Sequence, residues 1–236
     1  LLRFRHDLLK AIRDFFYNRN YLEVETPNLM VTAAPDPNIE PLKVYVDDKG
    51  PFFLHTSPEM GMKKLLQYDH QRIFQICKVY RVEENLEIHN TEFTMLEWYR
   101  EGTYLDAMEE VEQLITFVAG RVTIDDADHF EGPWKQYELA DLFAEMTSIN
   151  PYELKRGELF SAMQSIGFLG LDEGDSWNDL FLKLFIQEVE PKIPQKIPYF
   201  IKGWPLSIST MAKRNDTNRV ERFELYVNGL EIANGY

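Results

Sequence analysis

The sequence predicts an α+β fold in which a mostly antiparallel sheet is flanked by helices, within one domain over residues 1–236. Apolar residues recur at helical spacing near the N-terminus and again between residues 105 and 119. Several strand-like stretches are joined by short polar turns, which is typical of antiparallel pairing. The sequence contains neither an internal repeat nor a stretch with the composition of an interdomain linker.

The composition limits the classes of function. The chain carries 25 Lys and Arg against 39 Asp and Glu, a formal charge of -14. A broad nucleic-acid surface needs clustered basic residues, so this balance argues weakly against one. The single cysteine, Cys77, excludes an internal disulfide and fits a reducing compartment. No apolar run is long enough to cross a bilayer, so we expect a cytoplasmic protein without a membrane partner.

The first elements follow from periodicity and from turn residues. Residues 3–19 place apolar side chains at helical spacing, and residues 21–27 predict a short strand that Pro27 closes. Three prolines in residues 33–42 exclude a helix there and predict a loop. Residues 43–56 then predict a hairpin that turns at Asp48 to Gly50.

A helix start is predicted in the stretch "TSPEMGMKKLLQY". Thr56 is the expected N-cap, Pro58 lies in the first turn, and Glu59 stands at the capping-box position. The local capping pattern predicts that Glu59 completes that box and that Ser57 only occupies the first turn. The alternative, that this helix N-terminus presents both side chains to a substrate, stays open.

The second half of the chain is predicted to be helical before it returns to strands. Its expected elements, in chain order, are an amphipathic helix at 105–119, mostly helix at 137–190 with breaks near Asn150–Pro151 and at 167–175, a strand at 197–208, and a second hairpin at 219–235.

Two strand-like stretches, residues 74–83 and 93–99, predict a hairpin with one ionic face, because side chains of a strand alternate between faces. Leu96 and Trp98 point the other way, into the core. The ionic face carries Gln75, Cys77, Val79, Arg81, Glu83, Phe93, Met95, Glu97 and Tyr99.

The register of this hairpin follows from its loop. A loop centred near Glu87 sets Arg81 opposite Phe93 and Cys77 opposite Glu97. A slip of one residue would send the two sets of side chains to opposite faces.

Two interpretations of the ionic face stay open, since charged groups lose solvation unless they are paired. In the first, Arg81 pairs with Glu97 or Glu83 on a solvated sheet face. In the second, the face binds a ligand, with Arg81 and the loop residues His89 and Asn90 on phosphate oxygens, Phe93 on a flat base, and Glu97 and Tyr99 on a substrate ammonium.

The second hairpin contains Asn228–Gly229 between apolar residues, which is typical of a two-residue type I′ turn. Glu224 and Glu231 then share a face as diagonal neighbours, near enough to share a Mg²⁺ that phosphates also bind. An exposed face with Arg222 nearby is the alternative. The expected pairs are Val227 with Leu230, Tyr226 with Glu231, and Glu224 with Ala233.

Asn234 follows Glu231 by three residues, so regular alternation puts it on the other face of the strand. A role beside Glu231 therefore requires a bulge or a kink, and Gly235 indicates one.

These residues and their order resemble the catalytic core of class II aminoacyl-tRNA synthetases, nearest to the lysyl branch. The first helix with residues 21–27 resembles motif 1, residues 80–99 resemble motif 2, and residues 222–236 resemble the segment before motif 3. Within that branch, Ser57 and Trp98 are similar to the truncated paralogues that ligate (R)-β-lysine to a lysine of elongation factor P.

The resemblance implies roles by position. Arg81 would be catalytic, and Glu224 and Glu231 would hold Mg²⁺. The implied ATP-binding residues are Arg81, Val82, Glu83, His89, Asn90, Phe93, Glu224, Glu231 and Ile232. The implied substrate-binding residues are Ser57, Pro58, Glu59, Glu97, Tyr99 and Asn234.

The resemblance also implies a reaction. Lysine or (R)-β-lysine would react with ATP to give an adenylate and would then pass to a lysine of elongation factor P. tRNA is not the expected acceptor, and motif 1 indicates a homodimer. Two alternatives stay open: the catalytic core of a lysyl-tRNA synthetase, and a non-catalytic synthetase-like paralogue that binds and regulates a partner.

The sequence departs from the family pattern at several positions. Val82 stands where the family usually has Asn, Thr91 where it has Pro, and Ile88 where it has Arg. The glycine-rich motif 3, with its second catalytic arginine, is not found, nor is an anticodon-binding domain. We therefore expect that the chain is an incomplete view of a longer protein.

Overall fold

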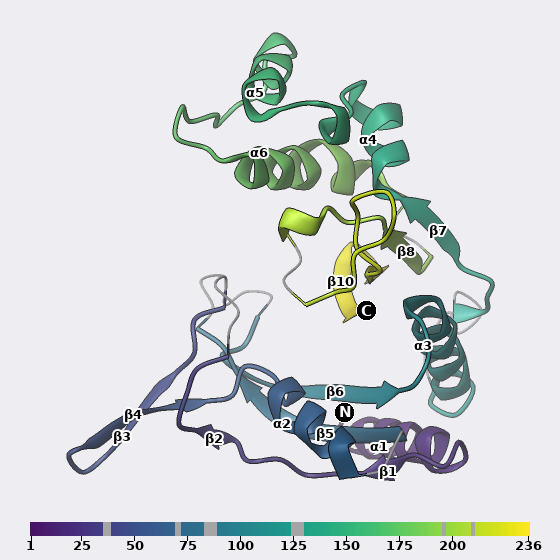
Figure 1. Ribbon diagram of the computed structural model, residues 1–236. Helices are drawn as coiled ribbons and strands as arrows, with labels where there is room; N and C mark the ends of the chain where they lie inside the picture. The colour runs from purple at the N-terminus through teal and green to yellow at the C-terminus, as the bar shows by residue number, and fades with distance from the viewer. Residues whose placement is uncertain (35–38, 69–71, 83–88, 124–129, 195–196, 209–210) are drawn as a thin grey trace. The chain divides into compact units, whose positions relative to one another are not determined.

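The computed structural model describes residues 1–34, 39–68, 72–82, 89–123, 130–194, 197–208 and 211–236. These residues form two compact units (Figure 1). One unit comprises residues 9–101, and the other comprises residues 1–8 with residues 102–236.

The unit of residues 9–101 is built on a three-stranded sheet in the order β1–β5–β6. Strand β1 (Leu22–Glu23) runs parallel to β5 (Arg72–Tyr80), which pairs antiparallel with β6 (Glu92–Arg100). Helix α1 (Leu2–Tyr17) enters this unit with its second half. The spacing of its apolar residues predicts a helix with one apolar face, and that face packs on one side of the sheet.

The contact between α1 and the sheet is aromatic. Phe16 stacks on Phe74 of β5 with ring centroids 4.7 Å apart. The ring centroid of Trp98 in β6 lies 5.4 Å from that of Phe16. Trp98 therefore points into the core, as its place in the alternation predicts. The opposite face of the same strands is left for the polar residues.

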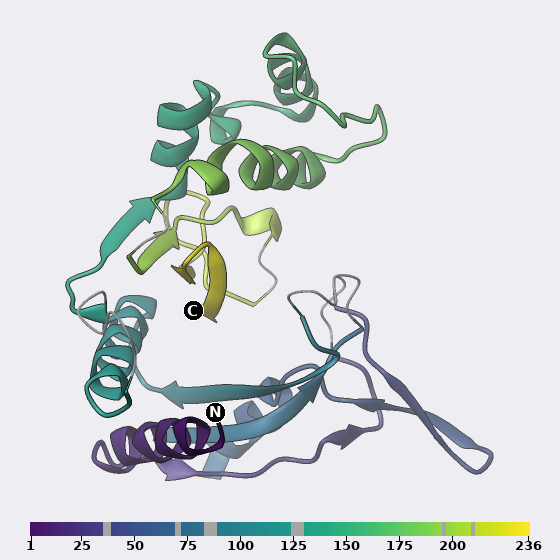
Figure 2. The same ribbon diagram turned by 180° about the vertical axis from the view of Figure 1, so that it is seen from behind.

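A second sheet of this unit, in the order β2–β4–β3, is antiparallel and projects as a long ribbon (Figure 2). Its strands are β2 (Leu29–Met30), β3 (Lys43–Val46) and β4 (Lys49–Leu54). The hairpin turns at Asp47 and Asp48, one residue earlier than predicted, with Asp47 at φ 53. Helix α2 (Glu59–Leu65) and the 3-10 turn η1 (Leu66–Tyr68) follow it.

The other unit contains a four-stranded sheet in the order β10–β9–β8–β7. Its strands are β7 (Lys135–Glu138), β8 (Tyr199–Lys202), β9 (Phe223–Val227) and β10 (Leu230–Gly235). Strand β7 falls partly in the stretch that the sequence predicts as helix. It is a strand because it pairs in parallel with β8, some sixty residues later in the chain, and no local pattern reveals such a partner.

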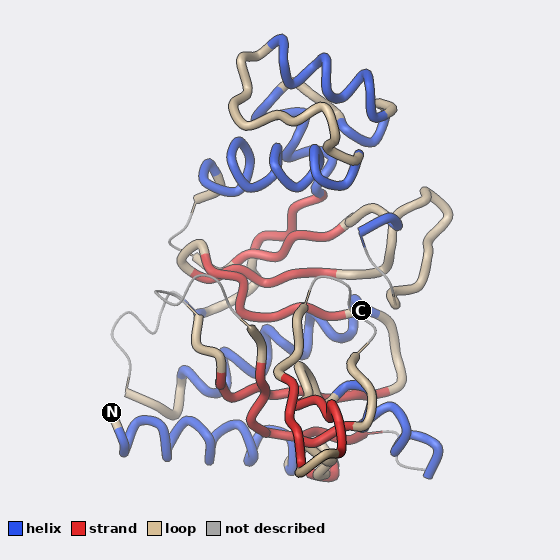
Figure 3. Tube along the Cα trace, turned by 90° about the vertical axis from the view of Figure 1, so that its left-hand side faces the viewer, coloured by secondary structure: helices blue, strands red, loops and turns tan. Residues whose placement is uncertain are grey.

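The helical segments of this unit are α3 (Tyr104–Ala119), α4 (Leu139–Thr147), α5 (Arg156–Ser165), α6 (Trp177–Leu184), the π-helical segment η4 (Phe185–Val189), and the 3-10 turns η3 (Pro151–Glu153), η5 (Glu190–Lys192) and η6 (Leu206–Ile208). Helices α4, α5 and α6 gather on one side of the strands, whereas α3 lies apart from them (Figure 1 and Figure 3). The predicted breaks at Asn150–Pro151 and at residues 167–175 both occur.

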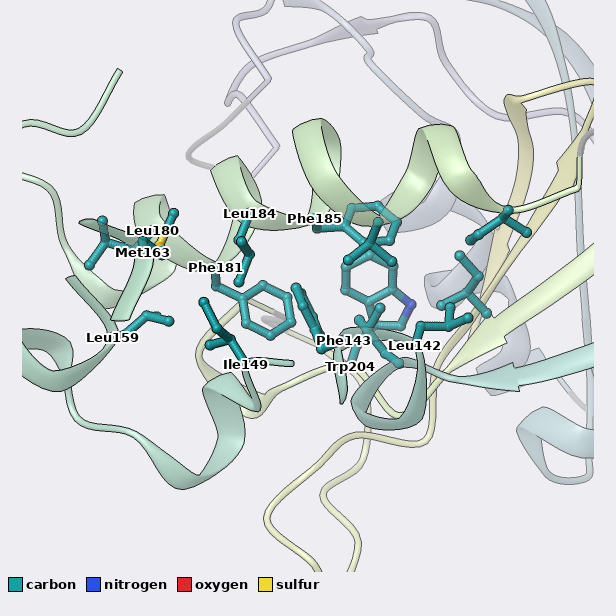
Figure 4. Close-up of a cluster of buried hydrophobic side chains, with 14 of the residues drawn as sticks. Leu142, Phe143, Ile149, Leu159, Met163, Leu180, Phe181, Leu184, Phe185 and Trp204 are labelled. Atoms are coloured by element: carbon teal, nitrogen blue, oxygen red, sulfur yellow. The ribbon is translucent and has the colours of Figure 1, made fainter. Parts of the chain in front are cut away.

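The core of this unit forms where α4, α6 and η4 meet (Figure 4). Phe143 packs edge-on against Phe181 at 4.9 Å, and Phe185 packs edge-on against Trp204 at 5.4 Å. This cluster anchors the segments that lead into β8 and β9. None of the helices in the described ranges is long and apolar enough to cross a membrane.

The fold agrees with the α+β prediction in class and corrects it in detail. The described strands form three sheets rather than one, and two of these sheets contain a parallel pair, β1 with β5 and β7 with β8. The remaining pairs are antiparallel. That the chain acts as one catalytic domain stays a prediction.

Replacing Phe74 with alanine tests the importance of the aromatic contact under β5. Phe74 is fully buried, so Phe74→Ala should lower the free energy of unfolding by about 3–5 kcal/mol, measured by chemical denaturation. Tyr68→Ala is the control, since Tyr68 is 66% exposed and should change that free energy by no more than about 0.5 kcal/mol. Equal losses in the two variants would show that the stacked rings do not hold this unit together.

Candidate active site

The hairpin of β5 and β6 has a different register from the predicted one. Gln75, rather than Cys77, lies opposite Glu97, and Val79 lies opposite Phe93. The predicted register was therefore wrong by two residues. Because the difference is even, each side chain keeps its face, and the predicted set of polar and aromatic groups still shares one side of the sheet.

Glu97 is the centre of a hydrogen-bonded cluster on that face. Ser57 donates its hydroxyl to Oε2 at 2.8 Å, and the hydroxyl of Tyr99 donates to Oε1 at 2.5 Å. Glu83, one of the two partners that the first interpretation gives to Arg81, lies outside the described residues. Each carboxylate oxygen of Glu97 is thus held by a neutral donor and keeps capacity to accept from a ligand.

Burial raises the pKa of Glu97 above the usual range of a carboxyl, and the Tyr99 and Ser57 hydrogen bonds oppose that rise. Glu59 nearby adds to it through charge repulsion, whereas Lys63 acts in the opposite direction. A carboxylate in this environment gains most from a cation that enters the site. The arrangement suits the recognition of an ammonium group.

Ser57 links this cluster to the start of α2. Its hydroxyl oxygen accepts a hydrogen bond from the backbone N–H of Glu59 at 3.0 Å while its proton goes to Glu97. The N-cap of α2 is Pro58, with no side-chain cap, so the predicted capping box with Thr56 is wrong. The Oε1 of Glu59 accepts instead from Lys63 Nζ at 2.5 Å.

Arg81 follows the end of β5 and lies beside Phe93. Its guanidinium carbon is 5.3 Å from the Phe93 ring centroid, and its Nε donates to the backbone carbonyl of Thr56 at 3.1 Å. The backbone N–H of Arg81 donates to the carbonyl of Thr91, which continues the ladder past the strand ends. The ring contact and the Nε hydrogen bond fix the position of the guanidinium, a group that is suited to bind phosphate.

The other described residues of the predicted nucleotide site in this unit are Val82, His89 and Asn90, and all three are exposed. The backbone N–H of Val82 donates to the carbonyl of Glu40 at 3.0 Å. Glu83 lies outside the described residues. Pro58 is buried at the start of α2, where its ring fixes the turn that carries Ser57.

Gln75 is a residue of this face that sequence reasoning assigned no role. Thr26 donates to its Oε1 at 3.1 Å, but its Nε2 is buried and finds no hydrogen-bond partner in the described part of the chain. The sequence feature that could have drawn attention to Gln75 is a glutamine within a strand otherwise rich in apolar residues. Cys77, its neighbour on the same face, is half-buried, and burial raises the pKa of its thiol to about 11, so it is not a nucleophile at neutral pH.

In the other unit, the hairpin of β9 and β10 turns at Asn228–Gly229 as predicted, with φ 51 and φ 74. Val227 pairs with Leu230, and Tyr226 pairs with Glu231, which confirms the first part of the register. The predicted pair of Glu224 with Ala233 is wrong, because the register shifts between Glu231 and Ala233. Ile232 is the extra residue of this bulge.

The bulge decides the position of Asn234. It sets Asn234 opposite Glu224 and so on the face that Glu231 shares, and the Asn234 amide donates to Glu231 Oε1 at 3.4 Å. The sequence predicted that Asn234 can act beside Glu231 only if the strand contains a bulge or a kink, and Gly235 indicated one. The structure contains a bulge, and it lies at Ile232 rather than at Gly235.

Glu224 is a buried acidic group with partners on its own strand. Arg222 donates to Oε1 at 2.5 Å, and Tyr226 donates to Oε2 at 2.9 Å. Burial and the nearby charge of Glu231 raise its pKa to about 8 despite these bonds. The exposed face that was the alternative is therefore wrong for Glu224, which is 4% exposed.

The donor set of this hairpin fits a magnesium ion that is bound mainly by phosphate. Within the described ranges, no group of three or more His, Cys, Asp or Glu side chains could hold a metal ion. Mg²⁺ is commonly held by one or two carboxylates together with substrate phosphates, and Glu224 with Glu231 can supply those carboxylates. Burial, and after it the charge of Glu231, raises the pKa of Glu224, and a bound cation would favour its ionised form.

The chain is similar in sequence to proteins of one known family. The profile of the class II tRNA synthetases (D, K and N) matches residues 1–236. A protein from Vibrio atlanticus (strain LGP32) called elongation factor P–(R)-β-lysine ligase is 35% identical over 244 residues, which cover 100% of this chain and 72% of that protein.

Two further relatives extend this similarity beyond one organism. The ligase of the same name from Vibrio cholerae is 36% identical over 249 residues, covering 100% of this chain and 72% of that protein. A protein from Aquifex aeolicus called a homolog of that ligase is 35% identical over 237 residues, covering 97% of this chain and 74% of the relative. The chain therefore belongs to the class II tRNA synthetase family of the D, K and N type.

Proposed function

We propose that this chain is an ATP-dependent ligase that activates lysine or (R)-β-lysine as an adenylate and transfers it to a lysine side chain of elongation factor P. Membership of the class II synthetase family supports the use of ATP. Relatives that carry the name of this ligase and match the whole chain at 35–36% identity support the acceptor. The alternative of a lysyl-tRNA synthetase core agrees with the same family profile, which includes the K type, so the names of these relatives are what favours the ligase.

The observation that carries this proposal is the cluster around Glu97. A buried carboxylate with two neutral donors, Ser57 and Tyr99, and with Glu59 nearby is suited to bind an amino group of a basic substrate. It lies on the strand that also carries Phe93. Substrate selection and nucleotide binding would thus use one rigid hairpin.

The first step requires positioning and charge stabilisation rather than a nucleophile on the enzyme. A carboxylate oxygen of the substrate attacks the α-phosphorus of ATP, the bond to the β-phosphate oxygen breaks, and pyrophosphate leaves. Arg81 would stabilise the charge that develops on the phosphoryl oxygens, and Phe93 would stack on adenine. We assign supporting contacts with ATP to Val82, Glu83, His89 and Asn90.

The second step transfers the acyl group. The uncharged amine of the acceptor lysine attacks the carbonyl carbon of the adenylate, an amide bond forms, and AMP leaves while the amine loses a proton. The chain needs no covalent intermediate, in keeping with a thiol at Cys77 whose pKa is about 11.

The hairpin of β9 and β10 is proposed to serve the same reaction. Glu224 and Glu231 would hold Mg²⁺, which when bound neutralises charge on the phosphates. Ile232, the exposed extra residue of the bulge, would contact ATP through its backbone, and Asn234 would contact the amino-acid substrate. We also propose a homodimer, on the basis of the resemblance of α1 to motif 1.

The acceptor is tested by offering elongation factor P and tRNA separately to the protein with ATP and each lysine isomer. We expect intact-mass spectrometry to show elongation factor P heavier by one lysyl residue, and acid-precipitable label on tRNA to stay at background. Lysylated tRNA with unmodified elongation factor P would instead identify a tRNA synthetase.

Arg81→Ala tests the role at the α-phosphate. Exchange of pyrophosphate into ATP should fall by about 10²- to 10³-fold, because a charge-stabilising donor is lost from the transition state. Arg72→Ala is the matched control, since Arg72 is an exposed arginine at the other end of β5. Normal exchange in Arg81→Ala, with an unchanged melting temperature, would remove Arg81 from the chemistry.

Glu97→Gln tests the ammonium contact. The KM for the lysine substrate should rise at least about tenfold while the KM for ATP stays the same, since a buried charge pair is lost. Glu92→Gln is the control, an exposed carboxylate on the same strand that pairs with Lys78.

The same variant gives a test by pH. Because the pKa of Glu97 is raised, the group is a carboxylate only above that pKa, and the KM for lysine should rise as pH falls through it. This dependence should disappear in Glu97→Gln. A KM profile that keeps its shape in the variant would show that another group titrates.

A further inference from the structure

Lys63 brings an ammonium group to the acidic residues that are proposed to hold the substrate's amino group. Its Nζ donates to Glu59 Oε1 at 2.5 Å and lies 6.0 Å from the ring centroid of Tyr99. Its charge also lowers the pKa of Glu97, against the larger effect of burial. One cation of the chain therefore interacts with three members of the Glu97 cluster.

The position of Lys63 is more than that of a solvated surface pair. Its side chain is 34% exposed and that of Glu59 is 20% exposed, so water screens this pair only in part. The four-residue spacing on α2 holds the ammonium on the helix face that carries Glu59. The Tyr99 ring, whose hydroxyl is bonded to Glu97, adds a cation–π contact from the neighbouring strand.

We propose that Lys63 is an internal competitor for the substrate's ammonium and thereby sets the affinity and the charge selectivity of this pocket. This inference rests on the proposed function, since it deepens the role given there to Glu59, Glu97 and Tyr99. In the free protein Lys63 neutralises part of the acidic cluster. A substrate ammonium has to displace it from Glu59, so weakly bound cations such as simple monoamines are rejected.

A purely structural role for Lys63 predicts the opposite result. If the ion pair only held Glu59 in a binding geometry, its loss would weaken the binding of the substrate. If Lys63 competes with the substrate, its loss makes binding tighter. The direction of the change in affinity therefore separates the two roles.

The test compares Lys63→Met, Lys63→Arg and Lys64→Met in the full chain. Methionine keeps helix propensity and length while it removes the charge. Lys64→Met removes the same charge from the next, exposed position of α2. Calorimetry with L-lysine, (R)-β-lysine and 1,5-diaminopentane measures binding, and pyrophosphate exchange measures KM for lysine and for ATP.

We expect Lys63→Met to bind the amines about two- to fivefold more tightly, as befits a partly screened ion pair, with the KM for lysine lowered in proportion and the KM for ATP unchanged. Lys63→Arg should resemble the parent, because it restores the charge. Lys64→Met should also resemble the parent. Unchanged or weaker binding in Lys63→Met, or an equal gain in Lys64→Met, overturns the inference.

The binding data separate this inference from the proposed function. Tighter binding of the diamine by Lys63→Met without pyrophosphate exchange in any form would uphold the competition and reject the ligase. Exchange in the parent without a gain in Lys63→Met would uphold the ligase and reject the competition. The absence of amine binding from every form would overturn both.

Discussion

The interaction on which the candidate site depends is the pair of hydrogen bonds that Ser57 and Tyr99 donate to Glu97. A carboxylate in a partly buried position is costly unless its oxygens are satisfied. The two hydroxyls satisfy it without neutralising its charge, since neither is a cation. The site can therefore keep a negative charge ready for a cationic ligand. This arrangement in turn requires the N-cap of α2, Pro58, to follow directly on Ser57, which contacts the middle of β6 through Glu97.

The aromatic face beneath the hairpin gives this cluster a rigid support. Phe16, Phe74 and Trp98 fix β5 and β6 from the side of α1, so the polar side chains of the other face have defined positions. Arg81 is fixed in the same way, by the Thr56 carbonyl and the Phe93 ring. Binding groups held by packing on the opposite face lose little conformational freedom when a ligand binds.

Charge compensation differs between the two hairpins. Around Glu97 the donors are hydroxyls, and the nearby cation, Lys63, donates to Glu59 rather than to Glu97 itself. Glu224 is instead tied directly to Arg222, and burial, with the nearby charge of Glu231, raises its pKa to about 8. The first environment is suited to an organic ammonium. The second offers two carboxylates, the donor type that a divalent cation prefers.

The sequence by itself determined the elements with strong local signals: the amphipathic helices α1 and α3, the Asn228–Gly229 turn, and the alternation that separates Glu97 from Trp98. Turn chemistry and periodicity are local properties, so they can be read from the chain. Only the tertiary structure decided the register of β5 with β6, the parallel strand β7, the bulge at Ile232, and the hydrogen bonds of Ser57. Those features depend on partners distant in sequence, and several registers or caps satisfy the same local pattern until long-range packing selects one.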